Sequence, residues 1–383
     1  MRILVSAGEA SGDMYAARLV RALEKQNGHS TYFGCTGPRL KEAGVQTVLD
    51  SSRLSVVGLA EVVSHLPGIY RDYRRLVRQL RAHPPDAAIL TDSPDFHLRL
   101  ARHLNLLNVP VFYLVAPQVW AWRQSRVRII RQRVRKLFCL FPFEESWFQD
   151  RQVDAIYIGH PLARIVHPRF TRAEFLERHG LAEQTRTVAI LPGSRVGEVA
   201  RHLPILLDAI QILRRQFAFQ AVLAIPKGFM ERLGLQTFRE RIDALSIKVI
   251  EDETWDVLAQ ADLALAASGT VTVEAAVLGT PMVTFYRVAP LSWWAGRRLV
   301  KVPFLSMVNL IAGRLVVPEL IQYDMTPENL AREAASLLDD PLKAAAMRQD
   351  LAAIKAMLTP RTDPFEEAAS LIAAELSGAK ELA

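Results

Sequence analysis

The chain has 383 residues, half of them hydrophobic, and a formal net charge of +7 at pH 7. This length and composition predict a globular protein with two buried cores, and the positive charge favours anionic partners: nucleic acid, an acidic membrane face or phosphorylated small molecules. The two cysteines, Cys35 and Cys139, argue against a disulfide framework or a zinc site and fit a reducing cytoplasm.

The beginning of the chain does not resemble a signal peptide, because its apolar part is short and Glu9 and Asp13 follow at once. No uncharged apolar run reaches about 18 residues, so no transmembrane helix is expected.

The first half alternates strands with helices. Short apolar runs predict strands that begin at Ile3 and that span 31–34, 87–91, 111–114 and 136–140, with helices or loops between them. The segment 158–168 contains two X-Pro steps and reads as a linker.

The second half repeats this plan, with strands predicted at 188–191, 220–225, 247–250, 263–266 and 282–286. After Tyr323 the chain has a helical composition interrupted by prolines. The pattern predicts an α/β protein with two doubly wound Rossmann-like domains, 1–160 and 170–324, that face a central cleft. The helices of 325–383 are expected to pack back on the first domain.

The turn after the first strand contains Gly8, Glu9, Ser11 and Asp13 but lacks the spacing of a dinucleotide-binding fingerprint. Ser11 could cap the following helix and Asp13 could complement its dipole. Glu9 is harder to explain structurally, and a functional role is favoured for it.

Asp92 follows the strand predicted at 87–91, which places it at the carboxyl end of the sheet. A carboxylate there could act as general base toward a hydroxyl nucleophile. Alternatively, Asp92 or Asp95 could only cap the next helix, which begins near Pro94. We expect Asp95 to be the cap and Asp92 to be catalytic.

Two strand-to-helix turns of the second half resemble anion-binding sites. The first contains Gly193, Ser194 and Arg195, and the second contains Ser268, Gly269 and Thr270. Free N–H groups at a helix start favour phosphate, and arginine adds a permanent charge. Glu274, one helical turn after Thr270, could accept hydrogen bonds from a ribose. Together these turns predict a site for a nucleotide diphosphate.

The sequence contains no Walker motif, metal-ligand cluster, zinc spacing or Asp-X-Asp pair, so we expect a reaction without a metal or other cofactor. It also lacks a G-x-S-x-G elbow, so hydrolase chemistry has no support.

An apolar stretch at 54–70 followed by five arginines is typical of contact with a membrane interface. Core packing would explain the apolar residues equally well. The predicted membrane-contact residues are Val56, Val57, Leu59, Val62, Val63 and Leu66.

Eight motifs occur in an order that resembles the lipid-A-disaccharide synthase family. They comprise residues 8–13, 92–96, 119–123, 141–144, 158–160 and 191–195, then Ser268 to Thr270 with Glu274, and 309–313. The resemblance runs from Ile3 to about Glu319.

The resemblance implies an inverting glycosyltransferase with two Rossmann-like domains. Its donor would be UDP-2,3-diacylglucosamine, its acceptor 2,3-diacylglucosamine 1-phosphate, and its product a β-1,6-linked disaccharide 1-phosphate. By the same analogy Glu9 and Ser11, with Asp13 nearby, lie on the acceptor side, Glu274 holds the ribose, and Asn309 supports the donor pocket.

Such an enzyme would be cytoplasmic, bound peripherally to the anionic inner leaflet of the inner membrane, without a nucleic-acid partner and with a homodimer as an option. Two alternatives are another UDP-sugar enzyme, such as a soluble glycosyltransferase or an epimerase, and a non-catalytic binder of membranes or nucleic acid. Intact Asp92 and Arg195 argue against the binder.

Overall fold

The computed structural model describes residues 1–28, 30–53, 59–232, 236–296, 299–300 and 302–381. The chain divides into two compact units. The first comprises Met1–Pro161 and Pro360–Ala383, and the second comprises Leu162–Thr359.

The first unit contains a seven-stranded parallel sheet in the order β3-β2-β1-β4-β5-β6-β7. Its central strands are almost completely buried apolar runs, which is typical of a parallel sheet covered on both faces. The strands are β1 (Arg2–Ala7), β2 (Thr31–Thr36), β3 (Gln46–Asp50), β4 (Ala87–Thr91), β5 (Val111–Leu114), β6 (Lys136–Cys139) and β7 (Ala155–Tyr157).

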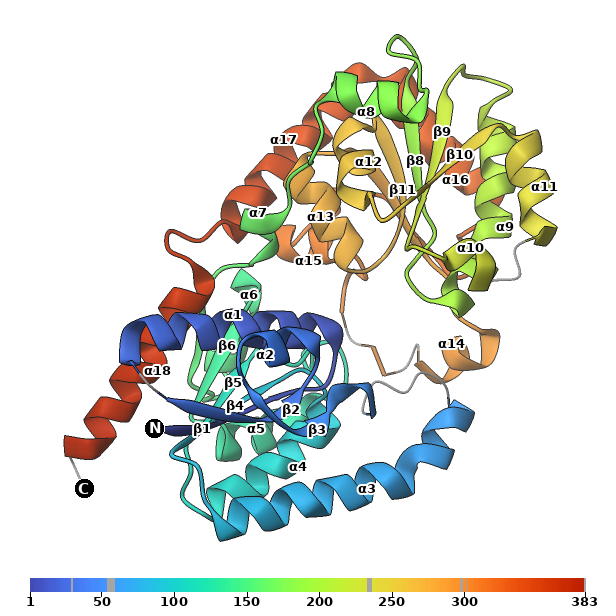
Figure 1. Ribbon diagram of the computed structural model, residues 1–383. Coiled ribbons are helices and arrows are strands. Elements are labelled where there is room, and N and C mark those ends of the chain that lie inside the picture. Colours follow the sequence, from blue (N-terminus) through green and yellow to red (C-terminus); the bar gives the residue numbers. More distant parts are fainter. Residues whose placement is uncertain (29, 54–58, 233–235, 297–298, 301, 382–383) are drawn as a thin grey trace. The chain divides into compact units, whose positions relative to one another are not determined.

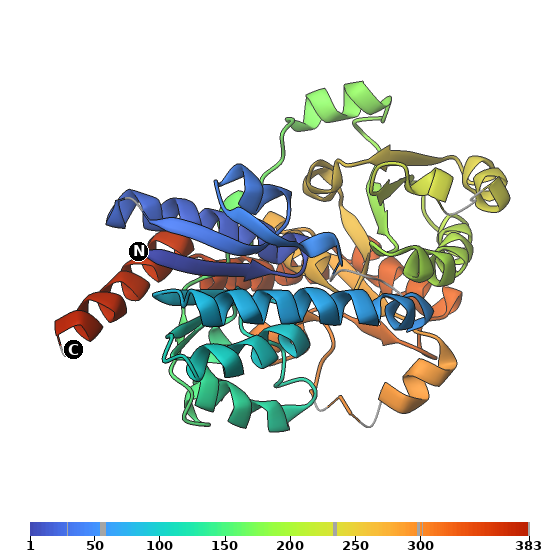
Figure 2. The same ribbon diagram turned by 60° about the horizontal axis from the view of Figure 1, so that its bottom comes forward.

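Helices cover both faces of this sheet, with α1 and α18 on one face and α3, α4 and α5 on the other (Figures 1 and 2). The helices of this unit are α1 (Ala10–Asn27), α2 (Pro38–Glu42), α3 (Leu59–Ala82), α4 (Pro94–Asn105), α5 (Val127–Arg133), α6 (Pro142–Gln149) and α18 (Pro364–Glu381), with single 3-10 turns at Ser51–Arg53 and Gln124–Arg126.

The second unit contains a six-stranded parallel sheet in the order β10-β9-β8-β11-β12-β13. Helices α9 and α16 pack together on one face, and α12 and α13 lie on the other (Figure 1). The strands are β8 (Thr187–Leu191), β9 (Gln220–Ile225), β10 (Ile247–Glu251), β11 (Leu263–Ala267), β12 (Met282–Tyr286) and β13 (Glu319–Ile321). The helices are α7 (Leu162–Ile165), α8 (Arg172–His179), α9 (Val196–Leu213), α10 (Phe229–Arg232), α11 (Gln236–Ala244), α12 (Thr254–Gln260), α13 (Thr270–Leu278), α14 (Pro290–Gly296), α15 (Met307–Ala312), α16 (Pro327–Asp339) and α17 (Pro341–Leu358).

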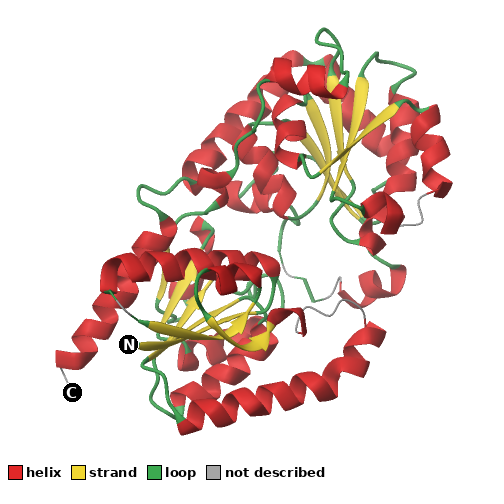
Figure 3. Cartoon of the chain, in the orientation of Figure 1, coloured by secondary structure: helices red, strands yellow, loops and turns green. Residues whose placement is uncertain are grey.

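Both sheets have the doubly wound strand order in which the third, second and first strands precede the fourth. The predicted fold class, two Rossmann-like α/β domains, is therefore confirmed (Figure 3). The buried central strands lie where the apolar runs predicted them, whereas β3, β7 and β13 were not predicted. These three lie at sheet edges, and β7 and β13 have only three residues each, so they lack a long apolar run.

The C-terminal helices divide between the two units, which corrects the expectation that 325–383 would all pack on the first. α16 buries Leu330, Ala334 and Leu337 and packs against α9, while α17 contacts α13, so both belong to the second unit. Only α18 belongs to the first unit.

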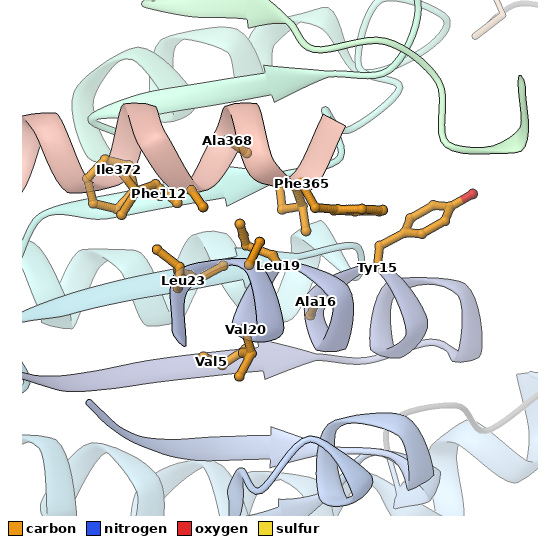
Figure 4. Close-up of a cluster of buried hydrophobic side chains, with 14 of the residues drawn as sticks. Val5, Tyr15, Ala16, Leu19, Val20, Leu23, Phe112, Phe365, Ala368 and Ile372 are labelled. Carbon is orange, nitrogen blue, oxygen red and sulfur yellow. The ribbon is translucent and has the colours of Figure 1, made fainter. Parts of the chain in front are cut away.

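The core contact between α18 and α1 explains this division. Phe365, Ala368 and Ile372 of α18 are fully buried and face Leu19 and Leu23 of α1 (Figure 4). An apolar stripe at helical spacing on each helix therefore closes one face of the first core.

Among the described residues, no helix combines the length and apolar composition needed to cross a membrane. Cys35 and Cys139 are both buried and free.

Candidate active site

Two loop clusters hold most of the predicted site residues, one in each unit. In the first unit, β1 and β4 are neighbours, and Gly8 and Asp92 follow their carboxyl ends. In the second unit, β8 and β11 are neighbours, and Arg195 and Gly269 follow theirs. Each cluster therefore lies at the point where the strand order reverses, which is where doubly wound sheets bind ligands.

The Asp92 carboxylate is held by the loop after β1. Its Oδ1 accepts a hydrogen bond from the Gly8 N–H at 2.8 Å, and its Oδ2 accepts one from the Glu9 N–H at 3.1 Å. Burial raises the pKa of Asp92 to about 7, although hydrogen bonds from Gly8, Glu9 and Ser93 oppose the rise and the charge of Glu9 adds to it. A carboxylate that titrates near neutral pH is well suited to general-base catalysis.

Glycine at two positions lets this carboxylate approach the first helix. A Cβ at Gly12 would lie 1.7 Å from Oδ2 of Asp92, and a Cβ at Gly8 would lie 2.9 Å from Oδ1 and 2.2 Å from the Ser93 hydroxyl oxygen. Any larger residue would displace the acid. The glycines of this turn therefore make room for a carboxylate.

We expect Gly12→Ala to fold but to lose activity. Alanine favours the helix by about 1 kcal/mol, yet its methyl group must push Oδ2 of Asp92 away, and a shift of about 1 Å can lower turnover roughly 100-fold. Steady-state kinetics and thermal unfolding of the same preparation measure both effects. Gly68→Ala, in α3 with no atom near the added methyl group, is the matched control and should keep normal turnover.

Glu9 and Ser11 are both exposed at the start of α1, where Glu9 occupies the N-cap position. The structure thus places Glu9 beside Asp92. Ser11 lies within the helix and is not its cap.

Asp13 has a structural role, which corrects its assignment to the acceptor side. Its carboxylate is buried and accepts hydrogen bonds from the N–H groups of Gly37 at 2.7 Å, Arg39 at 2.8 Å and Leu40 at 3.3 Å. These are the free donors at the start of α2, so Asp13 caps a second helix from within α1.

We therefore expect Asp13→Ala to lower the free energy of unfolding by roughly 2–4 kcal/mol, because several buried donors lose their acceptor. Denaturant unfolding at pH 7 measures this loss. Turnover per folded molecule should fall far less than in an Asp92 variant. An equal fall would mean that Asp13 acts at the acceptor side after all.

Asp95 does not cap α4, so the prediction that it is the N-cap of this helix is wrong. Ser93 occupies the N-cap position, and Asp95 is an exposed residue of the first turn that pairs with Arg126 and, at 3.4 Å, with Arg123. Arg123 and Arg126 thus pair with α4, and Arg133 donates to the Leu98 carbonyl of the same helix.

The second cluster is a pocket of about 340 Å³ formed by four strand ends and three helix starts. It is lined by Leu191, Gly193, Ser194, Arg195, Glu198, Ala224, Pro226, Thr254, Ala267, Ser268, Gly269, Thr270, Val271, Glu274 and Tyr286. Seven of the eight residues predicted to bind the nucleotide lie on its wall.

Arg195 is the N-cap residue of α9 and is two-thirds exposed, at 68% of its side chain. Its guanidinium pairs with Glu198 at 3.2 Å, and Glu198 also accepts a hydrogen bond from the Tyr286 hydroxyl at 3.1 Å. Glu198 thereby orients the arginine at the mouth of the pocket. A cation held in this way can bind a diphosphate.

Glu274 lies one turn into α13 and accepts a hydrogen bond from the side chain of Trp255. Burial raises its pKa above the usual range for a glutamate. A half-buried carboxylate with free acceptor capacity suits a partner that donates hydroxyl hydrogens.

Asn309 does not line this pocket. It is fully buried, and its amide oxygen accepts hydrogen bonds from the N–H groups of Val316 and Val317, while its NH₂ group donates to Glu319 and to the Val317 carbonyl. Asn309 thus fixes the loop before β13.

Three buried residues that were not predicted from the sequence support these loops. The His97 ring and the Tyr113 hydroxyl each form a hydrogen bond with the main-chain carbonyl oxygen of Asp92. In the second unit, His202 bridges two loops: its Nδ1–H donates to the Pro192 carbonyl at 2.7 Å, and its Nε2 accepts from the Arg287 N–H at 3.1 Å. Burial lowers the pKa of His202, so the neutral ring fits this pattern.

Two tryptophans, Trp120 and Trp122, follow β5. Trp120 is buried and donates to Glu144 at 3.0 Å, whereas Trp122 is 41% exposed.

No group of three His, Cys, Asp or Glu residues in the described part of the chain is placed to hold a metal ion. Val56 and Val57 lie outside the described residues. Leu59, Val62, Val63 and Leu66 fall in α3, where the side chains of 59–67 also lie outside the description.

Solved structures share this two-domain fold. A putative UDP-N-acetylglucosamine 2-epimerase from Listeria monocytogenes superposes with a TM-score of 0.62 at 17% identity, over 100% of this chain and 97% of that one. A glycosyltransferase from Rickettsia africae gives 0.58 at 11% identity, over 98% of each chain. These similarities define the fold as that of the GT-B class.

The sequence comparisons identify the family. The model of the family described as lipid-A-disaccharide synthetase matches residues 3–373. Lipid-A-disaccharide synthases from Solibacter usitatus and Geobacter sulfurreducens are 55% and 40% identical, with 98% and 93% of each chain covered. The chain belongs to the lipid-A-disaccharide synthetase family and is a glycosyltransferase of lipid A disaccharide synthesis, as its motifs predicted.

Proposed function

We propose that the protein transfers 2,3-diacylglucosamine from UDP-2,3-diacylglucosamine to the 6-hydroxyl of 2,3-diacylglucosamine 1-phosphate. The products are a β-1,6-linked disaccharide 1-phosphate and UDP. The observation that carries the proposal is the family match over residues 3–373. It is supported by a pocket at the second switch point that is lined by Arg195, Glu274 and hydroxyl side chains, and by an acid of raised pKa at the first.

The reaction is a single displacement with inversion. The acceptor oxygen forms its bond to the anomeric carbon as the bond from that carbon to the diphosphate oxygen breaks, and the electron pair of that bond leaves with UDP. Asp92 receives the proton of the hydroxyl, which must be removed as the oxygen attacks. An unprotonated carboxylate with its lone pairs facing the acceptor can perform this step.

The donor pocket stabilises the leaving diphosphate. Gly193, Ser194 and Arg195 contact one part of it, and Ser268, Gly269 and Thr270 contact the other through the N–H groups and dipole at the start of α13. In this proposal the guanidinium of Arg195 exchanges Glu198 for a phosphate oxygen. Glu274 accepts hydrogen bonds from the ribose.

Acylated substrates require contact with a membrane, and α3 supplies a suitable surface. Its second half buries Leu76, Val77 and Leu80 and exposes arginines on the opposite side. Tyr70 is 62% exposed, with Arg74 beside its ring. Aromatic and basic residues together favour an anionic bilayer interface, so we place the enzyme at the cytoplasmic face of the inner membrane.

Incubation of the purified protein with both diacylated substrates tests the function. The proposal predicts a product with the mass of the disaccharide 1-phosphate and one UDP per product. Hydrolysis of the donor without disaccharide, or epimerised donor, would contradict it.

Sedimentation with vesicles of anionic phospholipid at 0.15 M salt tests the membrane contact separately. Replacing Arg74 and Arg78 by glutamate should reduce the bound fraction several-fold, since each basic residue contributes about 1 kcal/mol. The exposed Arg215 of the second unit is the matched control. If the wild type, the Arg74 and Arg78 variant and the Arg215 variant bound equally, α3 would not be part of the membrane contact.

A further inference from the structure

The main chain at the predicted base has an unusual conformation. Asp92 and Ser93 both have left-handed backbone angles, with φ of 52° and 35°. Residues other than glycine rarely adopt this conformation, and it persists only where the surroundings enforce it. Something in the fold must therefore hold this loop in place.

Two buried side chains bind the same oxygen, the main-chain carbonyl of Asp92. The Nδ1 of His97, on α4, lies 2.9 Å from it, and the hydroxyl of Tyr113, in the middle of β5, donates to it as well. Both side chains are completely buried. A carbonyl oxygen has two lone pairs, so this acceptor is saturated.

The imidazole has a defined tautomer. A carbonyl oxygen can only accept, so Nδ1 must carry the hydrogen, and Nε2 is left to accept from the Ser6 hydroxyl at 2.8 Å. Burial lowers the pKa of His97 to about 4, so the ring is neutral at pH 7 and fits this arrangement. Residues of β1, α4 and β5 thus converge on the peptide that follows β4.

We propose that His97 and Tyr113 are positioning residues, which fix the main chain of Asp92 so that its carboxylate stays on the N–H groups of Gly8 and Glu9. The inference rests on the proposed function, because it assigns them a purpose in the same reaction. Both act through the main chain of Asp92, since their described hydrogen bonds to this residue end on its carbonyl oxygen.

Three substitutions separate this role from simple packing. Tyr113→Phe removes one donor and keeps the ring. His97→Gln places its amide near the Nε2 position, toward Ser6, and loses the bond to Asp92. His97→Asn places an amide NH₂ near the Nδ1 position and can keep that bond.

The expected result is a change in turnover without a change in donor binding. Tyr113→Phe and His97→Gln should lower kcat roughly ten- to hundredfold, because small displacements of a catalytic group are costly. KM for the UDP donor should stay within about twofold, because the donor pocket lies in the other unit, and His97→Asn should stay within roughly threefold of wild-type kcat.

Amide hydrogen exchange at Gly8 supplies a readout that does not depend on the reaction. Exchange there should accelerate in Tyr113→Phe and His97→Gln but not in His97→Asn, because the Asp92 carboxylate no longer holds that N–H. If Gly8 exchange and kcat both remain at wild-type values in the first two variants, or if asparagine loses as much as glutamine, the inference is wrong. A wild-type protein that makes no disaccharide but shows the predicted exchange pattern would overturn only the proposed function.

Discussion

Asp92→Asn should lower kcat for disaccharide formation by roughly 10²–10⁴-fold, the range that a general base contributes. The amide keeps the size of the side chain but cannot take the proton of the attacking hydroxyl. KM for the donor should change little, since the pocket that holds it lies in the other unit. Product formation followed by mass, at saturating donor and acceptor, measures the loss.

Asp95→Asn is the matched control, because this carboxylate lies three residues away, is exposed and is paired with Arg126. It should keep turnover within about threefold. If the two variants lost activity equally, the loop geometry, and not the proton acceptor, would explain the effect of Asp92→Asn.

The same substitution should change how stability depends on pH. The pKa of Asp92 is raised from 3.8 to about 7 in the folded protein. The folded state therefore binds this proton more tightly, and the contribution of Asp92 to the free energy of unfolding falls as pH rises from about 4 to about 7. Asp92→Asn should flatten the plot of unfolding free energy against pH between about 4 and 7. A cooperative unfolding transition in these measurements also shows that the inactive variant is folded.

Arg195→Ala is the second variant with a large expected effect. Removing a positioned donor from developing negative charge typically lowers kcat roughly 10²–10³-fold, and here the charge develops on the departing diphosphate. KM for the donor should rise as well, since the substrate already carries the diphosphate. Arg195→Lys should recover only part of the activity because lysine cannot bind bidentately.

Two controls define the Arg195 result. Arg215→Ala removes the same charge beyond the other end of α9 and should leave the kinetics unchanged. Glu198→Gln weakens the ion pair with Arg195. It should change the KM for the donor and leave the protein folded. An Arg195→Ala enzyme with normal kcat would mean that the arginine does not contact the leaving group.

Much of the fold was predictable because its central strands are continuous apolar runs, several of them followed directly by glycine, proline or serine. The parallel alternation then places Asp92, Arg195 and Gly269 at strand ends near the switch points. Local sequence was sufficient for these residues.

Other features depend on partners distant in the sequence. The carboxylate of Asp13 caps α2 from 24 residues away, and Asn309 serves a loop before β13, so neither has a local signal that distinguishes it from a ligand-binding residue. His97 and Tyr113 lie on buried faces and look like core. The apolar stripe of α16 predicts burial but does not say on which sheet, and this explains its wrong assignment to the first unit.

The pH dependence of disaccharide formation tests the central claim, that Asp92 accepts the proton of the attacking hydroxyl, most directly. Because the base must be ionised, kcat/KM of the wild-type enzyme should rise tenfold per pH unit below about 7 and level off above it, following the pKa of this carboxyl. The residual activity of Asp92→Asn should lack that limb. A wild-type profile that is flat from pH 5 to pH 8, or a limb that persists unchanged in Asp92→Asn, would contradict the claim.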